Sequence, residues 1–265
     1  RLMDFATSGP WLIAAYVACL GLNALLIGLG KSGFGGGLGL LGVALMSLVA
    51  SPQQMLGLLL PMVLVGDAIA VMQHRAQANP AMLKRTVPGG LVGLGLGAGM
   101  LVGLMQLSPD VLERALAGAI GMICLGLITG LMVRRWRGHA VALRCSGRRD
   151  FGVGLASSVL GVLAQAGGPL MTLYVAATQD SGRRIAATLA VFFFAMNLAK
   201  TPLYVATGIL DLATLWHSLL ALPLLVAGSI AGFWLNRRIR LEPFQLIVYG
   251  LTALSAVGLI VKAIV

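Results

Sequence analysis

Charged residues are scarce in this chain: Asp, Glu, Lys and Arg make up 10% of its 265 residues. A soluble domain carries about 25%, so this scarcity excludes an ordinary globular protein in water. Negatively charged residues are rarer than positively charged ones: the chain has eight Asp and Glu and nineteen Lys and Arg. Three cysteines without a CxxC pair predict neither a disulfide framework nor a metal site. We expect no metal and no organic cofactor.

The residues that fill the chain are hydrophobic (58%), together with thirty-six glycines that suit close helix packing. The apolar runs are continuous rather than alternating, which excludes an outer-membrane barrel. They predict an all-α, polytopic integral membrane protein with about eight to ten segments. We place the segments at 10–28, 35–50, 53–73, 87–107, 111–133, 151–166, 168–178, 185–206, 212–235 and 243–264. Because 168–178 is too short to cross, it and 151–166 predict a re-entrant hairpin or broken helices.

The placement of the positive charge argues against nucleic acid as the partner. Fourteen of the nineteen Lys and Arg residues lie in the loops 74–86, 134–150, 179–184 and 236–242. Cytoplasmic loops of membrane proteins carry such residues, so we assign these loops to the cytoplasm. Both termini then face the outer side of a cell membrane, which we expect to be a bacterial inner membrane.

The two halves of the sequence repeat. Pro88, Gly93 and Gly97 recur 135 residues later as Pro223, Gly228 and Gly232, and we interpret these glycines as packing faces. Pro109 recurs as Pro243, and Gly36-Gly37 aligns with Gly168-Pro169. We predict a first repeat at 1–133, a basic connector at 134–150 and a second repeat at 151–265. Because the halves begin on opposite sides, the repeats are inverted, which is a transporter architecture.

Apart from those in the loops and at the chain ends, three charged residues stand among apolar residues, where ionisable groups are candidates for function. Lys31 stands in a glycine run, 28–37, that we expect to leave the helix, and Lys200 precedes Pro202. Asp67 is the acid among them. Lys31 could instead snorkel to an interface, and Lys200 could be a structural partner of Asp67. Asp67 could carry a proton or act as a counter-ion. Two lysines against one carboxylate favour a bound anion.

Hydrogen-bond donors for an anion would come from two glycine turns and from nearby polar side chains. Polar side chains in membrane helices also bond ordinarily to neighbouring helices, so that alternative stays open. The candidate donors are Ser32, Gly33, Gly35, Gly36, Gln165, Gly167, Gly168, Asn197 and Thr201.

Two enzyme motifs fail. A P-loop needs glycine where Leu25 stands. An intramembrane serine protease using Ser32 needs a histidine within hydrogen-bond reach. His217, the candidate in a second apolar segment, is expected near the outer end of its segment, so we keep this enzyme only as a minor alternative.

The chain resembles the sulfite exporter TauE/SafE family of membrane permeases over nearly its whole length. The residues that carry the resemblance are Gly30-Lys31-Ser32-Gly33-Phe34-Gly35-Gly36-Gly37, Gly66-Asp67, Gly167-Gly168-Pro169, the run Asn197-Leu198-Ala199-Lys200-Thr201-Pro202-Leu203-Tyr204, and Gly208. The resemblance implies a permease, not an enzyme, for sulfite, sulfonate or sulfoacetate-type anions.

Several features of such a permease remain open in the sequence. An anion channel with the same lysines is the alternative to alternating access. A proton is a candidate coupling ion, and sodium remains open because unwound carbonyls can coordinate it. The glycine faces are compatible with a homodimer.

Overall fold

The computed structural model describes residues 10–34, 46, 50, 52–104, 146–164, 167–179 and 181–240, with isolated residues within 114–136 and 243–261. The described segments are helices joined by short turns, and no strand occurs among them. Four described helices are long and apolar enough to cross a membrane, or five if a bent pair counts as one span. The predicted all-α membrane class is confirmed.

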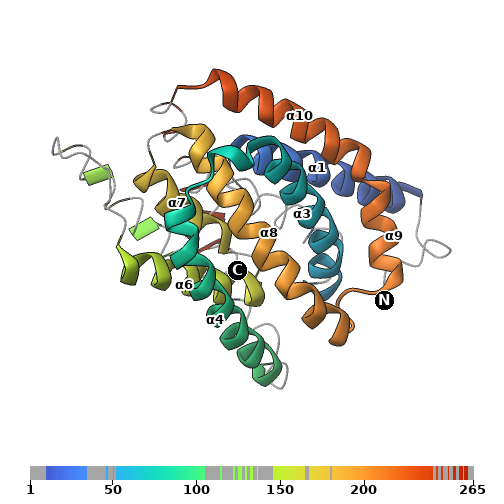
Figure 1. The fold of residues 1–265 in the computed structure, drawn as a ribbon. Coiled ribbons are helices and arrows are strands. Elements are labelled where there is room, and N and C mark those ends of the chain that lie inside the picture. The colour runs from blue at the N-terminus through green and yellow to red at the C-terminus, as the bar shows by residue number, and fades with distance from the viewer. Residues whose placement is uncertain are drawn as a thin grey trace.

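Two flanks of paired helices enclose a central pair (Figure 1). On one flank α1 packs along α10, on the other α4 packs along α6, and α3 and α8 meet between them. The elements are α1 (Pro10–Phe34), α3 (Pro52–His74), the 3-10 turn η1 (Arg75–Gln77), α4 (Pro80–Leu104), α6 (Gly147–Ala164), α7 (Gly167–Thr178), α8 (Gly182–Ala206), α9 (Leu212–Leu220) and α10 (Leu222–Arg238).

Most segment predictions in the described region agree with these helices, although several boundaries differ. Helix α4 begins at Pro80 rather than 87, and α6 begins at Gly147 rather than 151. The predicted segment 212–235 is two helices, α9 and α10, bent by 52°. Asp211 caps α9, and Pro223 lies in the first turn of α10, a position that proline favours. Predictions for 35–50, 111–133 and 243–264 fall largely outside the described residues.

We expect the chain to leave the helix at the glycine run 28–37, but the structure keeps the first part of this run helical, because α1 ends only at Phe34. For residues 28–34 the expectation is therefore wrong. Helix α1 continues through Gly28 and Gly33. These glycines serve close packing against α10 instead of a turn. A Cβ at Gly28 would lie 2.1 Å from the Leu225 carbonyl oxygen, and one at Gly33 would lie 3.1 Å from the Gly232 Cα.

The repeated glycines form packing faces, as predicted. On α4, a Cβ at Gly93 would lie 2.2 Å from the Leu155 carbonyl oxygen of α6. On α10, a Cβ at Gly228 would lie 2.2 Å from the Leu25 carbonyl oxygen of α1. Backbones can approach this closely only where no side chain intervenes. The two flanks therefore have the same kind of contact.

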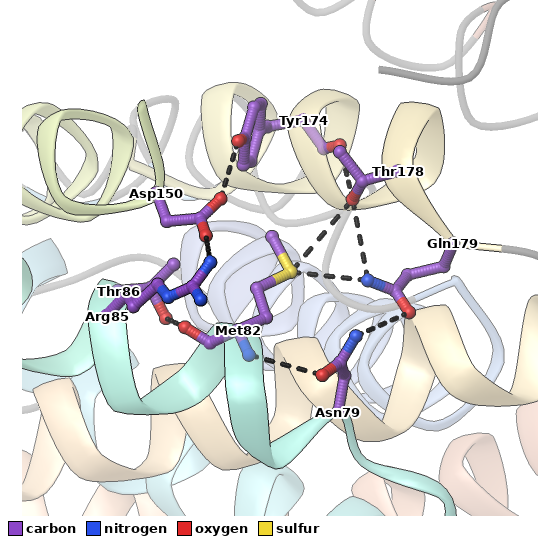
Figure 2. Close-up of polar contacts among 8 residues, drawn as sticks. All are labelled: Asn79, Met82, Arg85, Thr86, Asp150, Tyr174, Thr178 and Gln179. Atoms are coloured by element: carbon purple, nitrogen blue, oxygen red, sulfur yellow. Dashed lines mark hydrogen bonds and ion pairs between the residues drawn. The ribbon is translucent and has the colours of Figure 1, made fainter. Parts of the chain in front are cut away.

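Polar contacts around the buried Asp150 join α7 to α4 and α6 (Figure 2). Asp150, fully buried in the first turn of α6, accepts a hydrogen bond from the Tyr174 hydroxyl at 2.6 Å. The guanidinium of Arg85 on α4 lies 3.4 Å from the other carboxylate oxygen. Nearby, the Asn79 amide donates to the Gln179 side chain at 3.3 Å. These contacts hold the end of α7 in place.

We expect Gly93→Ala to destabilise the protein by about 1–3 kcal/mol, because the added methyl group would push α4 away from α6. Thermal unfolding in detergent measures the effect. Gly95→Ala is the matched control, two residues along the same helix, where a Cβ meets no described atom within 4 Å. Equal melting temperatures for the two variants would contradict this account of the packing.

Candidate functional site

A cavity lies where helices of both halves of the chain meet. Its polar lining consists of Lys31 from α1, Ser157 and Ser158 from α6, and Asn197 and Lys200 from α8. The first two residues of α7 also line it. The remaining lining is glycine or apolar: Ile27, Gly30, Leu59, Val63, Leu94, Gly161, Val162, Phe192, Phe193 and Met196.

A buried ion pair lies beside this cavity. The Lys31 Nζ is 2.7 Å from the Asp67 Oδ1, and the Asn197 Nδ2 donates to the Asp67 Oδ2 at 2.8 Å. Asp67 is fully buried and Lys31 is 8% exposed. The alternative that Lys31 snorkels to an interface is therefore wrong. Both oxygens of the carboxylate are engaged, and the contact joins α1, α3 and α8.

Lys200 is the second cation of the cavity and is also buried. Its Nζ lies 5.1 Å from the centre of the Tyr204 ring, and the Lys31 Nζ lies 4.5 Å from the centre of the Phe193 ring. Aromatic faces stabilise cations in desolvated places. The two lysines and Asp67 sum to a charge of +1 when all three are ionised.

The start of α7 faces the cavity and is held tightly against α6. Gly167 and Gly168 are its first residues and both line the cavity. The Ser157 hydroxyl donates to the Gly167 carbonyl oxygen at 2.7 Å, and a Cβ at Gly167 would lie 2.0 Å from the Ser157 carbonyl oxygen. Only glycine fits there. The first N–H groups of a helix have no partner within the helix, so such an end attracts anions.

Five of the residues predicted for the site line the same cavity: Lys31, Gly167, Gly168, Asn197 and Lys200. Asp67 does not line it but contacts Lys31. Three others do not line the cavity: Ser32, Gly33 and Thr201.

The hydroxyl of Thr201 donates to the Asn197 carbonyl oxygen within α8, at 2.9 Å. Gly33 packs against α10, and Ser32 lies in the last turn of α1. Gly35, Gly36 and Gln165 lie outside the described residues.

Sequence reasoning missed Ser157 and Ser158. Their signal was an adjacent pair of hydroxyls within an apolar segment, ten residues before the glycine turn. We interpret His74 from the sequence as an interfacial anchor at a cytoplasmic helix end, but it is buried, and its Nε2 lies 2.9 Å from the Ser32 carbonyl oxygen. Among the described residues, no histidine hydrogen-bonds the Ser32 hydroxyl. His217 instead lies 3.3 Å from the Tyr16 hydroxyl. In the described part of the chain, the protease alternative therefore has no histidine base bonded to Ser32.

Membrane-length helices around a cation-lined internal cavity define a polytopic membrane protein with a buried polar site. The chain belongs to the sulfite exporter TauE/SafE family, whose model matches residues 20–259. This is a family of membrane transporters of sulfite and related sulfur anions. No curated protein and no solved structure matches the chain.

We expect Asp67→Asn to destabilise the ligand-free protein by about 3–5 kcal/mol, because it leaves the buried Lys31 ammonium without its carboxylate. The double variant Lys31→Met with Asp67→Asn removes that ammonium as well and should unfold at a higher temperature than the single variant. Thermal unfolding of both in the same detergent makes the comparison. A double variant less stable than Asp67→Asn would contradict the ion-pair account.

Proposed function

We propose that the protein moves a small sulfur-containing oxyanion, of the sulfite, sulfonate or sulfoacetate type, across the cell membrane by alternating access. The observation that carries the proposal is the cavity lined by Lys31 and Lys200, with Asp67 as their carboxylate neighbour. Membership of the sulfite exporter family supports the substrate class.

The charge balance of the cavity supports an anionic substrate. Lys31, Lys200 and Asp67 carry a formal charge of +1 when all three are ionised, and a net charge in a low-dielectric interior is costly. The oxygens of Asp67 contact Lys31 and Asn197. A monoanion between the lysines would neutralise the remaining charge, and the N–H groups at the start of α7 would bind its oxygens. No cofactor enters this mechanism.

The packing supports two inverted repeats, at 1–133 and 151–265, on either side of the connector at 134–150. Contacts on the two flanks correspond. Gly93 of α4 lies against Leu155 of α6, and Gly228 of α10 lies against Leu25 of α1. Gly228 follows Gly93 by 135 residues, and Leu155 follows Leu25 by 130 residues. An internal two-fold relation would produce such a pair of contacts. Rocking of one repeat against the other around a central site is a common transport mechanism.

A binding experiment tests the function. We expect sulfite, thiosulfate, taurine or sulfoacetate to raise the melting temperature of the purified protein more than acetate does, and Lys31→Ala to abolish this shift. Lys84→Ala is the control, because it removes one exposed positive charge of α4 outside the cavity. A stabilising ligand whose effect survives Lys31→Ala would overturn the proposed site.

We propose in addition that transport is coupled to protons through Asp67. Protonating this carboxyl would raise the charge of the cavity and favour a dianion, so proton and anion would bind together. In proteoliposomes, a pH gradient should then accelerate anion movement in the direction of proton flow. Asp67→Asn, which resembles the neutral carboxyl, should remove the dependence on the gradient.

Asp211→Asn is the matched control for this experiment. Asp211 is an exposed cap of α9, and asparagine caps helices about as well as aspartate. This variant should therefore retain the response to the gradient. Rates in the unmodified protein that ignore the gradient would rule out the coupling while leaving the anion site standing.

A further inference from the structure

Ser158 has a buried hydroxyl group that ordinary packing does not explain. The residue lies in α6, lines the cavity and is 6% exposed. Its hydroxyl has no hydrogen-bond partner in the part of the chain that the structure describes. A buried donor without a partner costs about 1–3 kcal/mol.

Several other hydroxyl groups in these helices donate a hydrogen bond to a backbone carbonyl oxygen. A common solution is a hydrogen bond to the carbonyl oxygen four residues earlier. Five hydroxyls adopt it, at 2.7–3.1 Å: those of Thr86, Thr178, Thr201, Thr207 and Ser218. Ser157 instead bonds the Gly167 carbonyl oxygen. Ser158 makes neither kind of bond.

The position of Ser158 distinguishes it from the other hydroxyls that lack a partner. Ser32 and Ser229 also carry buried hydroxyls without a partner among the described residues. Neither of them lines the cavity, whereas Ser158 lines it together with Lys31 and Lys200. The unused donor of Ser158 therefore lies in the same cavity as the two cations.

We propose that Ser158 donates a hydrogen bond to the bound anion and selects for anions with three or more oxygens. The inference rests on the transport function proposed above. Donors then converge from four helices: ammonium groups of α1 and α8, the hydroxyl of α6 and backbone N–H groups of α7. A sulfite or sulfonate group offers three oxygens to these donors, and a carboxylate offers two. The hydroxyl therefore favours the sulfur anion.

Ser158→Ala tests the inference by calorimetric titration of the full chain with sulfite and with acetate. We expect the Kd for sulfite to rise about tenfold or more, as for a lost hydrogen bond to a charged group. The Kd for acetate should rise less, so the ratio of the acetate Kd to the sulfite Kd, which measures selectivity for sulfite, should fall. The ligand-free melting temperature should stay equal or rise, because the substitution removes a buried donor without a partner.

Ser157→Ala is the matched control from the adjacent position. It removes the bond to the Gly167 carbonyl oxygen and should lower the ligand-free melting temperature. An unchanged sulfite Kd in Ser158→Ala, or an equal loss for sulfite and acetate with reduced stability, would overturn the role of Ser158. If sulfite binding is weakened by Lys31→Ala but not by Ser158→Ala, the proposed function stands without it. If the unmodified protein binds no sulfur oxyanion, both proposals fall.

Discussion

The contact between Lys31 and Asp67 is the constraint around which the centre of the molecule is built. An ammonium and a carboxylate in a membrane interior are tolerable only together, because desolvating either one alone is strongly unfavourable. Their 2.7 Å separation requires α1 and α3 to stay in register, and the Asn197 amide adds α8 to the same contact. The cavity lies where these helices meet, so the ion pair and the cavity depend on one another.

Glycine packing allows this centre to form. The flanking pairs α1 with α10 and α4 with α6 approach so closely that a methyl group at several of their glycines would strike a carbonyl oxygen. At the start of α7 the same principle acts at the site itself, because Gly167 lies directly against Ser157. Close approach brings the N-terminus of α7 to the wall of the cavity that the two lysines also line.

Composition and charge placement predicted the membrane class and most helix positions, because long apolar runs have few other stable forms. They also predicted the lysines and Asp67, since charge is conspicuous in such runs. The role of Gly28 and Gly33 could not be predicted, because a glycine looks the same in a turn and in a helix contact. Asp150 was assigned to the connector, yet α6 begins at Gly147 and buries its carboxylate beside Tyr174.

The site could be predicted only where a residue type is unusual for its surroundings. Serine is common in membrane helices, so Ser158 does not stand out in the sequence. It becomes a candidate only when the partners of neighbouring hydroxyls are known. Thr201 illustrates the opposite error: it adjoins Lys200 in the sequence, but its hydroxyl bonds within α8.

In the proposed mechanism, charge and helix arrangement are connected through one carboxylate. A ligand can shift a conformational equilibrium only by contacting the two states differently. An anion at Lys31 competes with Asp67 for the same ammonium, and a proton on Asp67 weakens the same ion pair. Either event acts on the contact that joins α1, α3 and α8. Substrate and proton would therefore loosen the packing between these helices at the point where alternating access requires it to change.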